Sequence, residues 1–383
     1  MIQAVSIDEK EEWNRILSFF PQADVYFTRE YVNAFVLNGD GEAILLYYPG
    51  EDIQGMNVVL KRPCPVPETA GGEDAELRSY YDLVTPYGYG GFLISTGTGM
   101  EKPGISLNTR FCFDEAGSYL PEQENLLTPE AFLQAKEKLA NAYREYCAEH
   151  RIVCEFNRYH TVIGNAHALE NLYDVRDLGH TVCMDLSSED AMWANFTSGN
   201  RNVIRKAQKL GVTVKRGRSP ELYEQFREIY NETMDKVGAE GYYYFSREFY
   251  DSIYHDLGEQ AQLFYAEYEG EIAAIAIILF GGNQMHYHLS ASRRRFQTLG
   301  ATNVILYEAA RYGISLGMKT FHLGGGLGSH EDSLYQFKKR FHRGADTRFS
   351  IGRATFLPGV YERLCRINIG DKETGFFPAY RDI

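Results

Sequence analysis

The chain of 383 residues is long enough for two domains of ordinary size and for a large buried core. Aliphatic and aromatic residues make up 44% of it, with 28 tyrosines and 23 phenylalanines, so the composition indicates a globular, enzyme-like body and excludes a largely disordered chain. The formal net charge of −13 disfavours general binding to nucleic acids, DNA included, or to membrane surfaces.

No segment approaches the ~18 apolar residues that span a bilayer, and the acidic start MIQAVSIDEKEEWNRI lacks the apolar run of a targeting peptide. We therefore expect a cytoplasmic protein without a transmembrane segment. Six cysteines without a CxxC pair predict reduced, mostly buried thiols rather than a disulfide or zinc framework. We expect no bound metal, because His286 and His288 share a strand face without nearby carboxylate or thiolate ligands.

The first half of the chain predicts an α/β domain. Helices are expected over 8–20 and 28–37, and the apolar runs AILLYY and MNVVLK predict a β-hairpin. The stretch YYDLVTPYGYGGFLIS combines glycines with tyrosines, as a binding loop does, so Tyr87 and Tyr89 are candidate ligand contacts. A tyrosine-rich turn packed on the core fits equally well. An amphipathic helix with Thr128 as its N-cap is expected to run to residue 150.

A second round of helices and strands follows the strands RIVCEFN and TVCMDLS. It comprises a basic helix over about 194–210, a strand VTVKRG, two further helices over 221–237 and 247–257, and the strands LFYAEYEG and EIAAIAIILFG. The last of these is apolar at both parities, which predicts a strand buried in the middle of a sheet. The chain thus repeats one α/β plan. We expect an N-terminal domain over 1–186, a C-terminal domain over 187–360 and a tail over 361–383.

Residues 284–343 predict the order strand, loop, helix, strand, loop, helix, with both loops opening on the same side of a sheet. In the first strand Met285, Tyr287 and Leu289 alternate with polar residues, as expected of a cleft wall. Small residues after Gly300 leave the first-turn amides of the next helix uncovered, where they can bind an anion or oxyanion. An ordinary loop-to-helix turn explains the same residues. We interpret the stretch as an acyl-transfer cleft.

The basic helix stands out because residues 191–220 contain no Asp or Glu and seven cations. Arg201, Arg205 and Lys209 are spaced four residues apart, which places them along one ridge of a helix. Such a ridge favours a phosphate-bearing substrate or a nucleic-acid end. A solvated face balanced by acidic neighbours is the alternative.

The second half resembles the Fem-type peptidyltransferases of cell-wall bridge synthesis and the related GNAT acyltransferases. The segments NRNVIRKAQKLGV, HYHLSAS, TFHLGGG and DSLYQFKKRF carry the resemblance in that order, and the PYGYGG loop of the first half adds to it. The resemblance covers most of the chain. It implies an α/β fold of two tandem GNAT-like domains with mixed sheets, no metal or cofactor, and transfer of an aminoacyl group from charged tRNA to an amine of a cell-wall precursor.

The resemblance also implies roles for single residues. Lys338 matches the lysine that the family places near the donor end, where a cation stabilises negative charge, and Phe337 beside it is placed to stack on a terminal base. Tyr287 and His288 are candidates for proton handling. An exposed helix lysine and a core tyrosine are the alternatives for Lys338 and Tyr287. The expected substrate- and donor-binding residues are Arg201, Arg205, Lys209, Lys236, Tyr244, Arg295, Gly300, Asn303, Phe337, Tyr87 and Tyr89.

Two departures from the family pattern keep other functions open. The chain has Lys236-Val237-Gly238 followed by GYYYF where cell-wall members have an Arg-Asp-Gly run, which weakens the cell-wall assignment. The segment 297–302, QTLGAT, only approximates the pyrophosphate loop of acyl-CoA enzymes. One alternative is therefore an N-acyltransferase that uses acyl-CoA on an amino sugar or small amine. Another is a non-catalytic protein that binds a nucleotide sugar or peptide.

Overall fold

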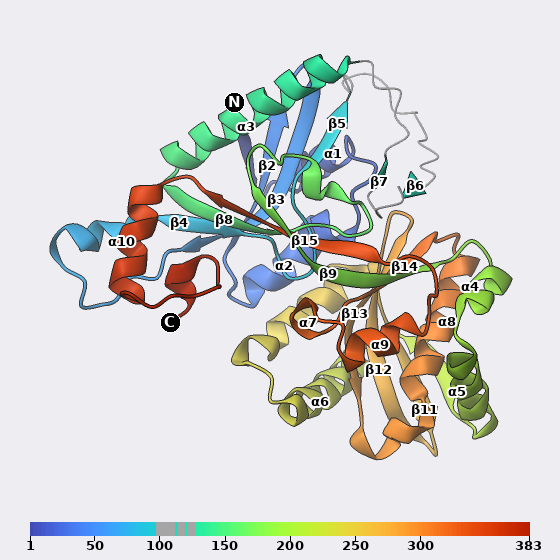
Figure 1. Cartoon of the computed structure of the whole chain (residues 1–383). Helices are drawn as coiled ribbons and strands as arrows, with labels where there is room; N and C mark the ends of the chain where they lie inside the picture. Colours follow the sequence, from blue (N-terminus) through green and yellow to red (C-terminus); the bar gives the residue numbers. More distant parts are fainter. Residues whose placement is uncertain (97–111, 114–118, 121–126) are drawn as a thin grey trace. The chain divides into compact units, whose positions relative to one another are not determined.

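The structure is a computed structural model that describes residues 1–96, 112–113, 119–120 and 127–383 (Figure 1). It contains two compact units. The first unit comprises Met1–Gln22, Gly39–Leu178 and Phe349–Ile383, and the second comprises Ala23–Asn38 and Gly179–Arg348. This division differs from a simple cut after residue 186, because one N-terminal segment belongs to the second unit and the chain returns to the first unit at its C-terminus.

The first unit is built on a mixed sheet in the order β1-β2-β3-β4-β8, with β5 paired to β3. The strands β1 to β4 are antiparallel neighbours, whereas β4 and β8 are parallel and are separated in the chain by α3. The elements that begin in this unit are β1 (Gln3–Ser6), α1 (Lys10–Leu17), β2 (Glu42–Pro49), β3 (Ile53–Pro63), η2 (Gly72–Ser79), β4 (Tyr81–Val84), β5 (Leu93–Thr96), β6 (Cys112–Phe113), β7 (Tyr119–Leu120), α3 (Pro129–Glu149), β8 (Ile152–Arg158), η3 (Asn165–His167), β9 (Asp174–Asp185), α10 (Pro358–Asn368) and η8 (Ala379–Arg381).

Helix α3 covers one face of this sheet (Figure 1). It begins as expected, because the Thr128 side chain accepts a hydrogen bond from the Ala131 N–H at 3.2 Å and Pro129 occupies the first turn. Its apolar side, with Leu139 and Tyr143, packs on residues of β2, β3 and β4. The expected helix over 128–150 is therefore confirmed.

The residues expected to form a tail are part of the core of the first unit. Tyr380 is fully buried, and its hydroxyl donates to the buried carboxylate of Asp82 on β4 at 2.9 Å. Arg381 Nε donates to the same carboxylate at 2.6 Å, and Arg62 Nε donates to its other oxygen at 2.8 Å. Because Asp82 is fully buried, the C-terminal residues help to neutralise a charge inside the sheet.

We expect Arg381→Ala to lower the free energy of unfolding of the first unit by about 1.5 kcal/mol, because it removes one of two cations from a buried carboxylate. Urea denaturation followed by circular dichroism measures the change. Arg366→Ala is the matched control, since Arg366 is exposed and lies 4.0 Å from its partner Asp74. Equal stability of the two variants would show that the contact between Arg381 and Asp82 does not stabilise the C-terminal segment.

The second unit has its own mixed sheet in the order β9-β14-β13-β12-β11-β10. All neighbours are antiparallel except β13 and β14, which are parallel. The remaining elements are η1 (Val25–Phe27), α2 (Arg29–Leu37), α4 (Glu189–Asn195), α5 (Ser198–Lys209), β10 (Thr213–Gly217), α6 (Pro220–Val237), η4 (Gly241–Tyr243), α7 (Arg247–His255), η5 (Gly258–Gln260), β11 (Ala261–Tyr268), β12 (Glu271–Gly281), β13 (Gln284–Ser292), η6 (Arg294–Leu299), α8 (Ala301–Ser315), β14 (Thr320–Gly324), η7 (Leu327–Ser329), α9 (Ser333–Lys339) and β15 (Thr347–Thr355), through which the chain returns to the first unit.

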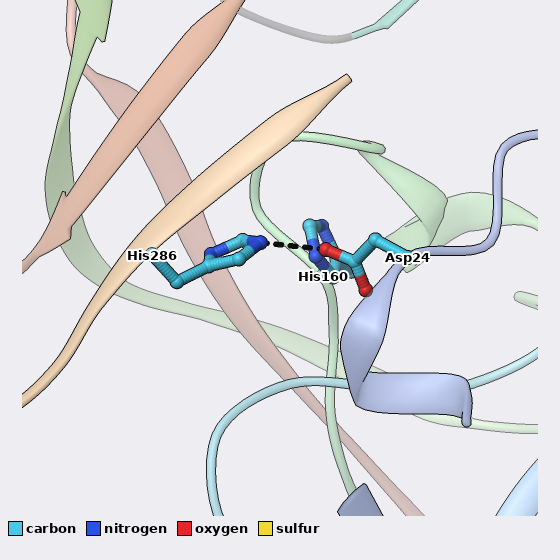
Figure 2. Close-up of side chains that lie close together, drawn as sticks. All are labelled: Asp24, His160 and His286. Atoms are coloured by element: carbon cyan, nitrogen blue, oxygen red, sulfur yellow. Dashed lines mark hydrogen bonds and ion pairs between the residues drawn. The ribbon is translucent and has the colours of Figure 1, made fainter. Parts of the chain in front are cut away.

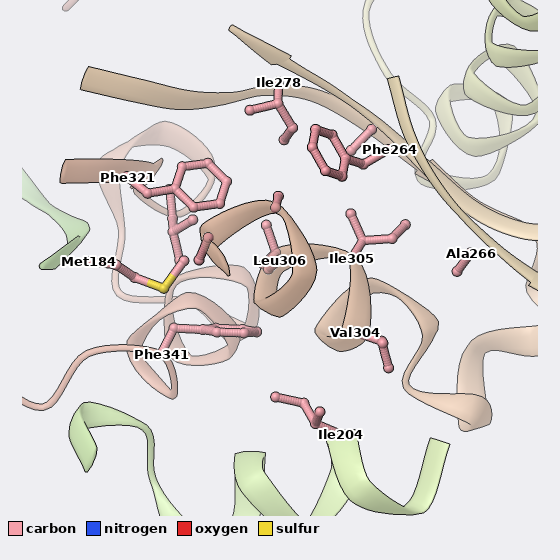
Figure 3. Close-up of a cluster of buried hydrophobic side chains, with 14 of the residues drawn as sticks. Met184, Ile204, Phe264, Ala266, Ile278, Val304, Ile305, Leu306, Phe321 and Phe341 are labelled. Carbon is pink, nitrogen blue, oxygen red and sulfur yellow. The ribbon is translucent and has the colours of Figure 1, made fainter. Parts of the chain in front are cut away.

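The core of the second unit lies between its sheet and helices α4, α5, α8 and α9 (Figure 3). On α8 the positions Ile305, Leu306, Ala309 and Ala310 are fully buried, as their spacing predicts. Strand β12 lies between β11 and β13, so the strand that is apolar at both parities is central in its sheet. Each buried leucine or isoleucine stabilises such a core by about 2 kcal/mol.

The opposite face of this sheet is covered by α6, which packs on β12 and β13. Helix α7 packs on α6, and α2 packs on α7. Phe35 of α2 contacts Phe249 of α7 with ring centroids 5.2 Å apart. Asn33 and Asn38 add hydrogen bonds to Asp256 and to the Ser246 N–H, each at 2.9 Å. These contacts explain why residues 23–38 belong to the second unit.

The two units follow one plan, as the sequence predicts. Three antiparallel strand pairs are followed by a crossover helix and a parallel strand, through β1-β2-β3-β4-α3-β8 in the first unit and β10-β11-β12-β13-α8-β14 in the second. No helix in the described residues is both long and apolar enough to cross a membrane.

Candidate functional site

The parallel strands β13 and β14 separate at their carboxyl ends. Their register runs from Gln284↔Thr320 to His286↔His322 and stops there. On its other side β13 pairs with β12 along its whole length, with a bulge at His288 between Tyr287 and Leu289. The loops after the two strands, 293–300 and 325–332, start from the same edge, which is the position where open α/β sheets bind ligands. The expectation that both loops open on one side agrees with this geometry.

The candidate proton carriers on β13, Tyr287 and His288, are both half-buried. Burial raises the pKa of Tyr287 to about 12, and the tyrosine packs partly on the α8 side of the sheet. Burial, followed by the charge on His286 when that residue is protonated, lowers the pKa of His288 to about 3. At neutral pH His288 is therefore an uncharged side chain and a weak proton acceptor. Its ring packs edge-on against Tyr31 of α2 at 5.7 Å.

A buried carboxylate pairs with His286, where the sequence suggested no acidic neighbour. Asp24 Oδ2 lies 2.6 Å from His286 Nε2, and each side chain is 1% exposed (Figure 2). The second carboxylate oxygen of Asp24 accepts the Tyr26 N–H at 3.1 Å, so the carboxylate is held from two directions. The Tyr26 ring packs on His286 at 4.6 Å. No local pattern predicts this pair, because its members are 262 positions apart.

A second buried polar group lies on β14 beside His286. The His322 ring contacts the His286 ring at 5.7 Å, and His322 Nε2 lies 2.8 Å from Thr181 Oγ1 on β9. Thr181 Oγ1 is in turn 2.6 Å from Thr347 Oγ1. The strand edge thus carries histidines fixed by hydrogen bonds from two different segments, which lowers their rotamer freedom.

Lys338 lies in the last turn of α9 and is 8% exposed. Its Nζ donates to the carbonyl oxygen of Gly325, in the loop after β14, at 2.6 Å. Burial lowers its pKa to about 8, and the Asp332 carboxylate partly opposes that shift. Within the described part of the chain no carboxylate lies within ion-pair distance of Lys338. It is therefore a buried, incompletely neutralised cation at the strand edge, not the exposed helix lysine that was the alternative.

The basic residues of the expected ridge all lie on α5, and Arg201 among them is engaged by local hydrogen bonds. The expected helix over 194–210 is interrupted before Thr197, which caps α5. Arg201 turns back and donates to the carbonyls of Phe196, Trp193 and Ala194 at 2.6, 3.3 and 3.5 Å. Its guanidinium thus caps the carboxyl end of α4.

Arg205 and Lys209 remain on the exposed side of α5. The Arg205 guanidinium lies 5.2 Å from the Trp193 ring, which gives it a cation–π contact. The start of α5 also meets the end of α9, because the Thr197 N–H donates to the Arg340 carbonyl at 2.9 Å. The helices that carry Arg201 and Lys338 are therefore neighbours.

The start of α8 is fixed by packing. Gly300 has a φ of +71°, and a Cβ there would collide with Val203 of α5. Asn303 donates to Asn200 Oδ1 at 2.8 Å and is buried. Both residues thus join α5 to α8. Arg295 of the preceding loop forms an exposed ion pair with Glu271.

The other expected binding residues lie at separate places in their units. Lys236 is exposed at the end of α6, and the Tyr244 hydroxyl after η4 donates to Asp235 at 2.8 Å. Phe337 is half-buried against Phe341, with ring centroids 5.6 Å apart.

In the first unit, Tyr87 and Tyr89 lie half-buried in the loop after β4. The Tyr89 ring contacts Phe349 at 5.9 Å. Burial raises the pKa of Tyr89 far above its ordinary value. The loop is held at its end by Asn165, whose side chain donates to the carbonyls of Gly90 and Phe92 at 2.9 and 3.0 Å.

A comparison with protein families places part of the chain in a known class of domain. Residues 195–339, which lie in the second unit, match the family model described as an acetyltransferase (GNAT) domain. The match contains α5, the bulged strand β13, α8 and α9. No curated protein matches the sequence.

Solved structures resemble the chain over nearly its whole length. The chain is similar to FemX, with a TM-score of 0.62 and 15% identity over 95% of this chain and 99% of that chain. It is also similar to a conserved protein of unknown function from Bacteroides thetaiotaomicron, with a TM-score of 0.52 and 11% identity over 92% and 99% of the two chains. These findings confirm the expected fold class, a tandem GNAT-like α/β fold, and the resemblance to Fem-type proteins.

Proposed function

We propose that the protein is an acyl-group transferase that moves an aminoacyl group from aminoacyl-tRNA to an amine, with an amine of a cell-wall precursor as acceptor. The observation that carries the proposal is the incompletely neutralised Lys338 beside the loop at the edge where β13 and β14 separate. A buried lysine is costly to maintain, and such groups concentrate at functional sites. The FemX-like fold and the GNAT family match support the class of reaction.

The proposed reaction needs no nucleophilic side chain from the protein. The acceptor amine attacks the ester carbonyl carbon, the carbonyl oxygen becomes an oxyanion, and the ester oxygen of the donor leaves. The protein contributes alignment of both reactants and stabilisation of the oxyanion. No metal or cofactor takes part in this proposal.

A transferase that uses acyl-CoA on an amino sugar or small amine is the second candidate. The description of the matched family model, an acetyltransferase domain, favours it. The close packing of Gly300 against Val203 gives the loop before α8 a structural reason for its glycine that is independent of a pyrophosphate group.

Transfer of a labelled amino acid from charged tRNA to an amine-bearing cell-wall precursor tests the proposal. We expect the wild type to catalyse it and Lys338→Ala to lower kcat by at least about 100-fold, as loss of oxyanion stabilisation does. Lys339→Ala is the matched control, because the neighbouring lysine pairs with Asp346 at 2.7 Å and should keep activity within about threefold. Activity with acyl-CoA and none with charged tRNA would favour the second candidate.

A further inference from the structure

The Lys338 ammonium is directed at a backbone group. Its one hydrogen bond to a described residue goes to the Gly325 carbonyl, at 2.6 Å. The Asp332 carboxylate, which partly opposes the pKa shift of Lys338, is hydrogen-bonded elsewhere, since its oxygens accept the Tyr335 and Leu327 N–H groups at 2.9 and 3.2 Å. Lys338 and Asp332 therefore both fix the backbone of the loop 325–332.

The two glycines in this loop are required by close backbone approach. A Cβ at Gly325 would lie 2.8 Å from the His180 carbonyl oxygen. A Cβ at Gly326 would collide with the His330 carbonyl oxygen and with the Asp332 carboxylate. The peptide between the two glycines is thus held by backbone on its flanks and carries no side chain that could cover it.

The orientation of this peptide follows from its planarity. In a trans peptide the N–H points opposite to the C=O. Because Lys338 holds the Gly325 carbonyl toward α9, the Gly326 N–H points away from that helix. No residue in the described part of the chain accepts a hydrogen bond from this N–H. The group lies two residues beyond the end of β14, at the edge where β14 has left β13.

We propose that Lys338 is a positioning residue, which holds the Gly325–Gly326 peptide so that the Gly326 N–H donates a hydrogen bond to the oxyanion of the transfer reaction. This inference rests on the proposed function and deepens it. As the amine nitrogen bonds to the carbonyl carbon, the π-electron pair moves to the oxygen, which the Gly326 N–H stabilises. The pair then reforms the carbonyl, the bond to the donor oxygen breaks, and that oxygen receives the proton that the amine loses.

The two possible roles of Lys338, positioning of the peptide and direct stabilisation of the oxyanion by its charge, predict different pH dependences of kcat. A neutral lysine amine still has N–H groups and can donate to the Gly325 carbonyl, whereas a direct electrostatic role ends when the ammonium loses its proton. The pKa of about 8 places this loss of charge within a range that is convenient for assays. Comparing wild type with a variant at each pH cancels the titration of the acceptor amine.

The test is the ratio of kcat between the wild type and Lys338→Met from pH 7 to 9.5, under saturating donor, with Lys338→Gln as a second variant. We expect a ratio of about 100 that changes by less than about threefold over this range, with KM for the donor changed by less than about threefold. A ratio that falls about tenfold per pH unit above pH 8 for both variants would overturn the positioning role. Absence of transfer by the wild type would instead refute the proposed function.

Discussion

Asp24→Ala is expected to destabilise the second unit by about 4 kcal/mol, because it leaves His286 buried without its carboxylate. Both side chains are 1% exposed, so water cannot take over the lost hydrogen bond. The substitution also removes the acceptor of the Tyr26 N–H, where the chain enters η1. Urea denaturation followed by tryptophan fluorescence measures the effect, since Trp193 belongs to this unit.

A double-mutant cycle separates the pair from its surroundings. Asp24→Leu combined with His286→Leu removes both polar groups, and we expect this variant to be more stable than Asp24→Leu alone. Glu331→Ala provides a matched control, because Glu331 and His180 form the same kind of pair at 3.2 Å with side chains 56% and 49% exposed. The control should lose less than about 0.5 kcal/mol. Additive losses in the cycle would show that Asp24 and His286 do not stabilise each other.

Local patterns in the sequence predict most elements of this fold. Helices α3 and α8 follow from apolar residues at helical spacing and from a Thr128 cap, and the central strand β12 follows from its length and continuous apolar character. The common edge of the loops after β13 and β14 follows from the order strand, helix, strand, because two parallel strands need a crossover. These features depend on residues within one element or within one strand–helix–strand unit.

Local sequence patterns do not predict features that depend on contacts between residues far apart in the chain. Asp24 lies in a short segment between two N-terminal helices, and nothing near it in the sequence marks it as the partner of His286. The membership of residues 23–38 in the second unit depends likewise on packing between Phe35 and Phe249. Tertiary contacts select these arrangements among many that local propensity allows.

Residue type alone also does not determine which contacts a single side chain makes. An arginine on a helix can bind a phosphate or cap a neighbouring helix, and Arg201 caps α4. A glycine before a helix can admit an anion or a close neighbour, and Gly300 admits Val203. Burial of Lys338 had no local signal, because the segment QFKKRF contains two adjacent lysines of which only one is buried.

Lys338→Met is expected to stabilise the second unit at pH 7 by about 2 kcal/mol while it lowers activity. The pKa of Lys338 falls from its ordinary value of 10.5 to about 8 on folding, which corresponds to a penalty of about 3 kcal/mol for burying the charged form. Removing the charge removes that penalty. Loss of the hydrogen bond to Gly325 costs about 1 kcal/mol of this gain.

The pH dependence of stability has a defined sign. Below pH 8 the lysine is charged in the folded and the unfolded chain, so the folded protein carries the whole penalty. Between pH 8 and 10.5 the unfolded chain binds more protons, so wild-type stability rises relative to Lys338→Met and the advantage of the variant disappears.

Urea denaturation of both proteins at pH 7, 8.5 and 10 measures this trend, with Lys339→Met as the control, since its lysine is paired with Asp346 and should show no gain. A Lys338→Met protein that is less stable than the wild type at pH 7 would mean that Lys338 stabilises the fold. A gain in stability together with a loss of transfer activity would mean that the chain retains this buried lysine for its reaction, at the expense of stability.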